Sequence, residues 1–274
     1  MFKKVGIVGT GLIGGSIAIA IKKSGIAKRI VGVCRHKESL LLAKKNRIVD
    51  EASLSLEVLK DVDFLILATP VNVIINLSER ISKIIPKNCI VTDVGSTKGE
   101  IVSVLEKNFS NYVGSHPMAG SEKRGVVNAN AGIFKNTICF LTPTKKSEKK
   151  VIEALGNFWE KLGAKVILLN PEKHDFILSF VSHLPHIAAF SLISSIPSDL
   201  LKFGSTGLKD TTRIASSDGQ IWADILLSNR KNLIKAIDIY QDEISGLKHA
   251  IQRNDRKALC GFLKKAKAKR EILA

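Results

Sequence analysis

Three glycines near the N-terminus have the spacing of a turn that binds phosphate. Residues 9–14 read Gly-Thr-Gly-Leu-Ile-Gly, the pattern G-x-G-x-x-G, between an apolar run at 5–8 and a helical pattern at 12–24. A strand, a tight turn and a helix in this order form a dinucleotide-binding unit. Gly9 permits the turn, Gly11 lets the backbone approach a pyrophosphate, and Gly14 lets helix and strand pack closely. The N-terminus of the helix favours that anion; a glycine turn without a ligand is the alternative. The predicted cofactor-binding residues here are Gly9, Thr10, Gly11, Leu12, Ile13 and Gly14.

The end of the second predicted strand indicates which dinucleotide fits. In NAD-binding versions of this unit, an acidic residue about 20 positions later binds the ribose 2′-hydroxyl. Residues 33–37 read Val-Cys-Arg-His-Lys and contain no carboxylate. Cys34 takes the place of the acid, and Arg35 can hold a 2′-phosphate through two charge-assisted bonds. We therefore predict NADP, with Cys34, Arg35 and His36 at the cofactor. NAD, with Arg35 stacked on adenine, is the alternative.

Thr69 and Pro70 follow a third apolar run, at 64–68. Doubly wound sheets bind their ligands at the carboxyl ends of the strands. We therefore expect Thr69 and Pro70 to flank the nicotinamide, although a structural turn explains this pair equally well.

The elements that would position these residues alternate in type as far as residue 168. Runs rich in Ile and Val predict strands, and amphipathic stretches between them predict helices. The strands are expected at 5–8, 29–33, 64–68, 90–94, 112–114, 138–141 and 166–169, and the helices at 12–24, 71–85, 98–108 and 148–162. This alternation is typical of the α/β class, with a Rossmann-type, doubly wound and mostly parallel sheet.

The pattern changes after residue 170. Strand-like runs end, Pro171 can open a helix, and amphipathic stretches follow at 221–247 and 256–272. We expect a dinucleotide-binding domain at 1–168 and an all-helical domain at 169–274. Because such a helical domain commonly buries its apolar surface against a second copy, a homodimer through this domain is predicted.

Composition restricts the class of protein. Lysine and arginine number 42 against 25 acidic residues, and the resulting charge of +17 attracts anions. The lysines are scattered and aromatic residues make up 5%, so no nucleic-acid partner is expected; the role of the basic stretch at 264–270 stays open.

The four cysteines form no CxxC pair, which predicts reduced thiols and no metal site in a cytoplasmic protein. We expect no apolar run long enough to span a bilayer, and no membrane partner.

Four further segments follow the glycine turn in a fixed order. They read Asp-Val-Gly-Ser-Thr-Lys at 93–98, Ser-His-Pro-Met-Ala-Gly-Ser-Glu at 115–122, Ser-His-Leu-Pro-His at 182–186 and Lys-Asp-Thr-Thr-Arg-Ile-Ala at 209–215. The ordered set, from about residue 4 to at least residue 240, resembles the prephenate/arogenate dehydrogenase family. The resemblance implies that a cyclohexadienyl precursor of tyrosine, prephenate, is oxidised and decarboxylated to 4-hydroxyphenylpyruvate with hydride transfer to NAD(P). Because no chorismate mutase segment or regulatory domain is recognised, a monofunctional enzyme is expected.

The resemblance implies two catalytic residues. His116 is the predicted acceptor of the hydroxyl proton, because histidine titrates near neutral pH and this one is expected in a Gly/Pro-rich loop after a strand. A histidine that only caps the loop is the alternative. Ser96 resembles the family serine that bonds both the substrate hydroxyl and the nicotinamide side, although it could also cap the helix expected at 98–108.

The resemblance also implies a set of substrate-binding residues. Arg213 matches the arginine that holds a substrate carboxylate; a surface ion pair with Asp210 is the alternative. His186 is implied to face the substrate side chain, which favours prephenate over arogenate, and His183 is expected to be a structural hydrogen-bonding residue. A metal at these two histidines would lack further ligands. The remaining residues implied to hold or gate the pocket are Asp210, Trp222, Ser121 and Glu122.

Three other interpretations remain open. The enzyme could prefer arogenate, or accept both substrates, and form tyrosine directly. It could be another two-domain Rossmann dehydrogenase acting on hydroxy acids, which would normally offer a lysine base on a helix. It could also be a sensing protein that binds NAD(P) without turnover.

Overall fold

The computed structural model describes residues 1–120 and 125–273. The chain divides into two compact units, Met1–Asn229 and Arg230–Ala274. The second unit contains two helices that pack on each other, α10 (Arg230–Gln252) and α11 (Arg256–Glu271). All strands of the described chain belong to the first unit.

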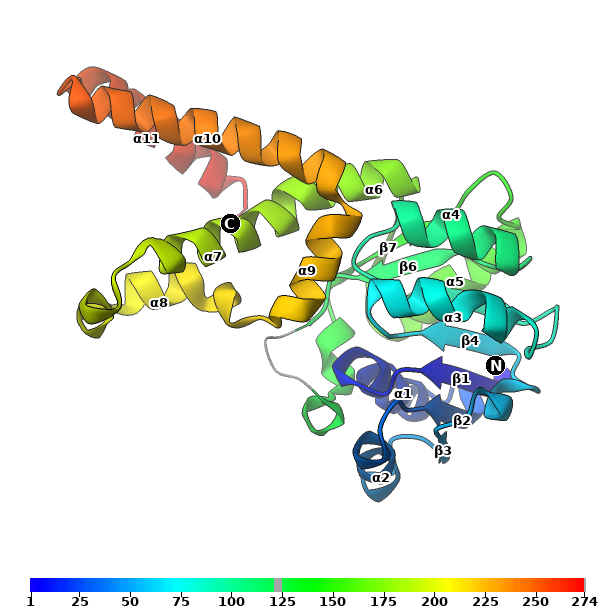
Figure 1. The fold of residues 1–274 in the computed structure, drawn as a ribbon. Coiled ribbons are helices and arrows are strands. Elements are labelled where there is room, and N and C mark those ends of the chain that lie inside the picture. The colour runs from blue at the N-terminus through cyan, green and yellow to red at the C-terminus, as the bar shows by residue number, and fades with distance from the viewer. Residues whose placement is uncertain (121–124, 274) are drawn as a thin grey trace. The chain divides into compact units, whose positions relative to one another are not determined.

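A five-stranded parallel sheet forms the centre of the first unit, in the order β3-β2-β1-β4-β5 (Figure 1). The strand order reverses between β1 and β4, and doubly wound sheets bind ligands at such a reversal. The strands are β1 (Phe2–Val8), β2 (Ala27–Val33), β3 (Glu51–Ser53), β4 (Phe64–Leu67) and β5 (Ile90–Asp93).

Alternate residues of each strand enter different cores, as a sheet covered on both faces requires. Phe64 and Ile66 of β4 belong to the cluster that includes residues of α1 and α5, whereas Leu65 and Leu67 belong to the cluster with α3 and α4. The predicted Rossmann-type α/β fold is therefore confirmed. The covering helices are α1 (Leu12–Ser24), α3 (Val71–Ser82), α4 (Gly99–Asn108) and α5 (Lys149–Lys161).

A second, three-stranded sheet has the order β6-β7-β8. β6 (Gly114–Pro117) runs antiparallel to β7 (Ile138–Thr142), which pairs in parallel with β8 (Lys165–Leu168). The strand predicted at 112–114 therefore begins at Gly114. It contains His116, so the expectation that this histidine lies in a loop is wrong.

Two helical expectations also differ from the structure. Helix α2 (Lys37–Lys45) is not foreseen by the sequence pattern, and the stretch 221–247 is two helices rather than one. Helix α9 (Gly219–Ser228) ends at Asn229, whose φ of −114° and ψ of 23° leave the helical region. The Asn229 side chain is buried and donates to the carbonyl oxygen of Asp175 at 2.7 Å. This tertiary contact accompanies a break that the amphipathic pattern does not indicate.

Helix α6 (Pro171–Leu178), a π-helical turn (Ser179–His183) and helix α7 (Leu184–Ser195) follow one another without a break. Pro185, in the first turn of α7, has no N–H to donate, and the wider π turn before it accommodates its ring. The combined helix has 25 residues and a mean hydropathy of 1.7 over its most apolar window, so by length and composition alone it could cross a membrane. The expectation that no apolar run is long enough is therefore wrong, although a single helix of this kind is weak evidence for a membrane.

The domain boundary expected at 168/169 lies in the link between β8 and α6. Residues on both sides of this link belong to the first compact unit, and α6 contacts both α4 and β7. The division into 1–168 and 169–274 stays a prediction.

Candidate functional site

The glycine turn has the geometry that its motif predicts. Gly9 has a φ of 93°, in the left-handed region that favours glycine. A Cβ atom at Gly14 would lie 1.9 Å from the carbonyl oxygen of Gly9, so a larger residue could not pack here. A Cβ atom at Gly11 would meet nothing within 4 Å. The space beside the N-terminus of α1 is therefore open, and a dinucleotide pyrophosphate fits it.

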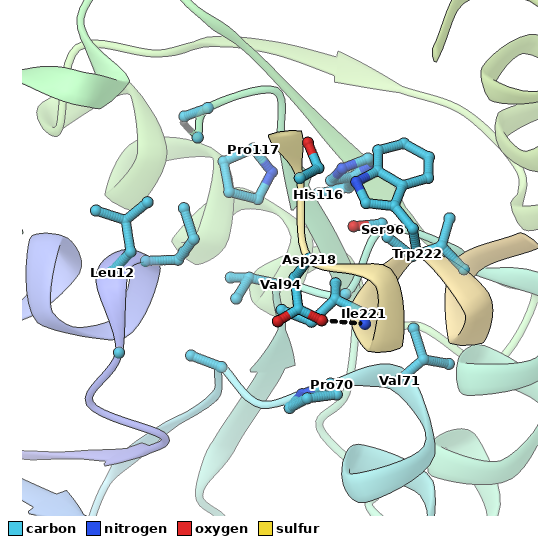
Figure 2. A pocket seen from close by; sticks show the side chains of 18 of the residues that line it. Leu12, Pro70, Val71, Val94, Ser96, His116, Pro117, Asp218, Ile221 and Trp222 are labelled. Carbon is cyan, nitrogen blue, oxygen red and sulfur yellow. Dashed lines mark hydrogen bonds between the residues drawn. The ribbon is translucent and has the colours of Figure 1, made fainter. Parts of the chain in front are cut away.

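A cavity of about 670 Å³ adjoins this turn. In Figure 2, Leu12 lies at one side of the cavity and Trp222 at the other, with His116 and Ser96 between them in that view. The cavity joins the cofactor turn to the residues expected to act on the substrate. The predicted residues that line it are Gly11, Leu12, Ile13, Thr69, Pro70, Ser96, His116, His186, Arg213 and Trp222.

The predicted ribose-binding residues lie outside this lining. Cys34 is buried and its Sγ lies 3.0 Å from Thr10 Oγ1; burial raises the pKa of this thiol. Arg35 and His36 are exposed directly after β2, where α2 begins. Of these residues, Arg35 and His36 are therefore the accessible ones.

One predicted substrate-side residue lies outside the cavity lining, and two others are not among the described residues. Asp210 is exposed on α8 (Thr206–Thr212) and is not part of the lining. Ser121 and Glu122 lie outside the described residues.

His116 is the most buried of the polar groups that line the cavity. Only 9% of it is exposed. Burial lowers its pKa well below the ordinary value, and the neighbouring His174 and Lys98 lower it further. The imidazole is therefore neutral at pH 7, which is the state that a proton acceptor requires.

Two residues that sequence analysis missed lie behind His116. Its Nδ1 is 2.9 Å from Nε2 of His174, and Nδ1 of His174 is 2.8 Å from Oδ1 of Asp175. Asp175 also accepts backbone N–H bonds from Lys98 at 2.7 Å and Gly99 at 2.8 Å. A His-Asp pair inside a helix has no recognisable motif, and 58 residues separate His174 from His116; only the fold brings them together.

These contacts also correct one expectation for Ser96. Helix α4 begins at Gly99, and its first N–H groups are satisfied by Asp175 rather than by Ser96. The alternative role of Ser96 as the helix cap is therefore wrong. Ser96 is half-buried and lines the cavity.

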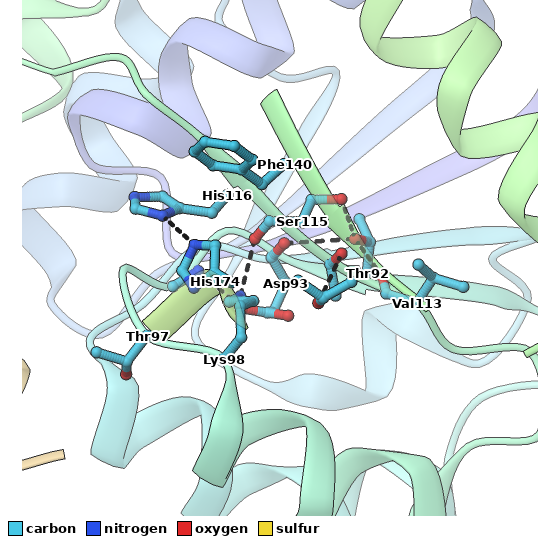
Figure 3. Close-up of polar contacts among 12 residues, drawn as sticks. Thr92, Asp93, Thr97, Lys98, Val113, Ser115, His116, Phe140 and His174 are labelled. Carbon is cyan, nitrogen blue, oxygen red and sulfur yellow. Dashed lines mark hydrogen bonds and ion pairs between the residues drawn. The ribbon is translucent and has the colours of Figure 1, made fainter. Parts of the chain in front are cut away.

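A buried ion pair holds the strand that carries His116. Lys98 contacts Asp93, and both side chains are fully buried. Lys98 Nζ also donates to the carbonyl oxygen of Ser115 at 2.8 Å (Figure 3). The Tyr112 hydroxyl donates to Asp93 Oδ1 at 2.7 Å. Because the charges are paired and hydrogen-bonded, the pair can be buried. It connects the end of β5 to the residue that precedes His116.

The helical side of the cavity contains a stacked pair. His186 lies on Trp222 with ring centroids 3.5 Å apart and planes inclined by 23°. Nδ1 of His186 is 2.9 Å from the carbonyl oxygen of Ser182. A carbonyl can only accept, so this nitrogen carries the proton and Nε2 of the neutral ring is an acceptor.

His183 does not line the cavity. Its Nδ1 lies 3.1 Å from Nδ2 of Asn229, and burial lowers its pKa to about 4. These contacts agree with the structural role expected for it. Within residues 1–120 and 125–273, no group of three or more His, Cys, Asp or Glu side chains could hold a metal ion.

Comparison with known proteins identifies the family. Residues 17–168 match the model described as prephenate dehydrogenase, nucleotide-binding domain, and residues 170–265 match prephenate dehydrogenase, dimerization domain. A prephenate dehydrogenase of Bacillus subtilis is 36% identical over 278 residues, which cover 97% of this chain and 75% of that protein. The Aquifex aeolicus prephenate dehydrogenase, solved with hydroxyphenyl propionate and NAD+, is 37% identical with a TM-score of 0.94, covering 100% of this chain and 99% of the other. The Synechocystis arogenate dehydrogenase is 29% identical with a TM-score of 0.83, covering 99% and 100%. The chain therefore belongs to the prephenate dehydrogenase family of nicotinamide-dependent oxidoreductases.

Proposed function

We propose that this chain converts prephenate to 4-hydroxyphenylpyruvate and CO2 with reduction of NAD(P), in tyrosine biosynthesis. The observation that carries the proposal is the shared cavity, in which Gly11 of the cofactor turn, His116 and Arg213 line one space. The ligand of the Aquifex enzyme, hydroxyphenyl propionate, is a phenol with a carboxylate side chain. A neutral imidazole and a guanidinium that line one cavity suit a substrate that has a hydroxyl group and carboxylates.

Each proposed role follows from the chemistry of the group. His116 takes the proton of the ring hydroxyl, the carbon that bears this hydroxyl gives up a hydride, and the electrons of the bond to the ring carboxylate enter the ring as CO2 leaves. The resulting phenolate oxygen then takes the proton back, which gives the phenol of the product. The bound nicotinamide supplies the hydride acceptor. Ser96 bonds the same hydroxyl, and Arg213 holds a carboxylate with its planar fork. His186, stacked on Trp222, faces the substrate side chain.

We propose NADP as the preferred cofactor. No carboxylate follows β2, and Cys34 is buried against Thr10. The exposed Arg35 and His36 directly after β2 support the proposal, because their side chains can bond a 2′-phosphate. The Aquifex relative holds NAD+, so NAD is the alternative.

One observation favours arogenate as a second candidate substrate. Nε2 of neutral His186 is an acceptor, because Nδ1 is bonded to Ser182. The arogenate side chain offers an ammonium donor to such a nitrogen, whereas the keto acid side chain of prephenate offers only acceptors. Prephenate would bind best with His186 protonated. The Synechocystis relative is an arogenate dehydrogenase.

The organisation of the protein is proposed on the same basis. We assign 1–168 to cofactor binding and 169–274 to substrate binding and dimerization, and the matched dimerization domain supports a homodimer. The four cysteines are free, which supports a cytoplasmic location.

The test is a set of steady-state rates with prephenate and arogenate, each with NAD and NADP. The proposal predicts turnover, with the highest kcat/KM for prephenate and NADP. Replacing Arg35 with alanine should raise KM for NADP about tenfold and leave KM for NAD unchanged. Higher kcat/KM for arogenate would select the second candidate. Cofactor binding without reduction for either substrate would overturn the proposal, in favour of the sensing protein or of a dehydrogenase for another substrate.

A further inference from the structure

A histidine can accept a substrate proton only through a nitrogen that has none. Neutral imidazole carries one proton, on Nδ1 or on Nε2, and the hydrogen bond of one nitrogen decides the state of the other. In His116, Nδ1 faces His174, so Nε2 is the nitrogen left to reach a ligand in the cavity. The proposed chemistry therefore requires the proton on Nδ1.

Asp175 decides which nitrogen of His174 carries a proton. Its carboxylate accepts two backbone N–H bonds at the N-terminus of α4, from Lys98 and Gly99. One amide donates to each of the two carboxylate oxygens, so both oxygens are acceptors in this geometry. Nδ1 of His174, 2.8 Å from Oδ1, is therefore the donor in that contact.

The protonation of His174 then decides that of His116. With its proton on Nδ1, neutral His174 offers Nε2 as an acceptor, 2.9 Å from Nδ1 of His116. We propose that His174 and Asp175 are positioning residues that hold His116 with its proton on Nδ1 and its Nε2 free of a proton. This inference rests on the proposed role of His116 as the proton acceptor. When His116 takes the substrate proton on Nε2, its ring becomes positively charged. The Nδ1–H bond to His174, which in turn donates to Asp175, stabilises this charge.

The surroundings of this chain favour a single arrangement. His174 is fully buried, and the ring of Phe140 packs on it edge to face at 5.4 Å. His116, whose hydrogen bond to His174 is drawn in Figure 3, is also buried. A buried acceptor left without a donor is costly, so a reversed proton order, which would leave His174 Nδ1 as an acceptor facing a carboxylate that also only accepts, is disfavoured.

Two amide variants of His174 separate positioning from packing. In His174→Asn the side-chain amide ends near the position of Nδ1, so it can still bond Asp175 but cannot reach His116. In His174→Gln the amide extends to the position of Nε2, and its oxygen can accept the Nδ1–H bond of His116. Both variants leave the cap of α4 by Asp175 in place, and thermal melting checks that both fold.

The first measurement is the steady-state rate with prephenate and NAD(P). His174→Asn should lower kcat about tenfold to a hundredfold, since misplacing the proton of a catalytic histidine removes much of its effect. KM for both substrates should stay within about twofold, because no binding group changes. His174→Gln should restore most of the lost kcat. Equal kcat in His174→Asn and the parent, or equal loss in both variants, would overturn the proposal.

The second measurement reads the tautomer directly and needs no turnover. Nitrogen NMR of histidine-labelled protein distinguishes protonated from unprotonated ring nitrogens, and the signals of His116 are assigned by their loss in His116→Asn. The parent should show a proton on Nδ1, and His174→Asn should shift His116 toward the other tautomer. A parent with its proton on Nε2 would refute the inference. If instead the tautomer is as proposed but His116→Asn keeps full activity, the role of His116 fails while the positioning contact stands.

Discussion

The two sides of the cavity are built differently. On the sheet side, His116 is buried in a strand and is hydrogen-bonded through His174 to a carboxylate. On the helical side, Arg213 is exposed in a short 3₁₀ turn, and His186 is half-buried against Trp222. Under the proposed function, the buried and hydrogen-bonded groups would perform the proton transfer, and the more accessible groups would recognise the substrate.

Helix α9 connects the two sides. Asn72 of α3 donates to Asp224 of α9 at 2.8 Å, and the hydroxyls of Thr97 and Ser228 lie 2.9 Å apart. Trp222 lies on this anchored helix, whereas Arg213 precedes it. We therefore expect substitutions on the sheet side to change kcat and those on the helical side to change KM.

The largest effect is expected from His116→Asn. Loss of the proton acceptor should lower kcat about a thousandfold, within the usual range for general base catalysis, with little change in KM. Initial rates of nicotinamide reduction with prephenate measure it. His249→Asn, on an exposed histidine of α10, is the control and should match the parent. Full activity in His116→Asn would show that His116, on the sheet side of the cavity, is not the proton acceptor.

The contrast between the sides also explains what could be predicted from sequence. Helix α1 has the predicted bounds because glycines flank it, and Gly25 closes it with a φ of 61° and N–H bonds to Ile21 and Lys22. The residues His116, Arg213 and His186 lie in motifs, and the structure places them on one cavity.

Contacts between distant segments account for what was missed. His174 and Asp175 act on His116 only across tertiary contacts. Helix α4 is capped by Asp175 of α6, 77 residues from Lys98, so the neighbouring Ser96 gave a plausible but wrong cap. The periodicity of a local stretch of sequence carries no information about a hydrogen bond to a residue that is distant in the chain.

The second prediction concerns acid stability, and it tests how strongly the buried imidazoles depend on staying neutral. The pKa of His183 is lowered from 6.5 to about 4, and the pKa values of His116 and His174 are lowered as well. As the pH falls below 6.5, these histidines take up protons in the unfolded chain but stay neutral in the folded chain. The stability that is present above pH 6.5 is therefore lost as the pH approaches 4. His183 alone should account for about 3 kcal/mol of the free energy of unfolding.

Denaturant unfolding at several pH values and one fixed protein concentration measures this loss. His183→Asn keeps an acceptor near the position of Nδ1 for Asn229 but cannot titrate, so its free energy of unfolding should fall less steeply between pH 6.5 and 4. The exposed variant His249→Asn should follow the parent. A slope unchanged by His183→Asn would contradict the prediction.

The third prediction tests the recognition side. Arg213→Lys keeps the positive charge and loses the planar fork, so KM for prephenate should rise about tenfold to thirtyfold, or roughly 1.4–2 kcal/mol. The value of kcat should change by less than about threefold. Arg230→Lys changes an exposed arginine outside the cavity lining and should have no effect. A fall in kcat at constant KM would indicate that Arg213 acts in the chemical step rather than in substrate binding.

The smallest effect is expected from the two tryptophans, which form a matched pair across the comparison. Trp222 stacks on His186, so Trp222→Phe should weaken that stack by about 0.5–1 kcal/mol and raise KM for substrate about threefold. Trp159 is fully buried and donates to Ser115 Oγ at 3.0 Å, so Trp159→Phe should lower the free energy of unfolding by about 1 kcal/mol and leave KM unchanged. The sequence contains two tryptophans, so the fluorescence of Trp159→Phe comes from Trp222 and should respond to substrate. If Trp159→Phe raised KM as much as Trp222→Phe, substrate recognition would depend on the sheet side as well, and the division between the two sides would fail.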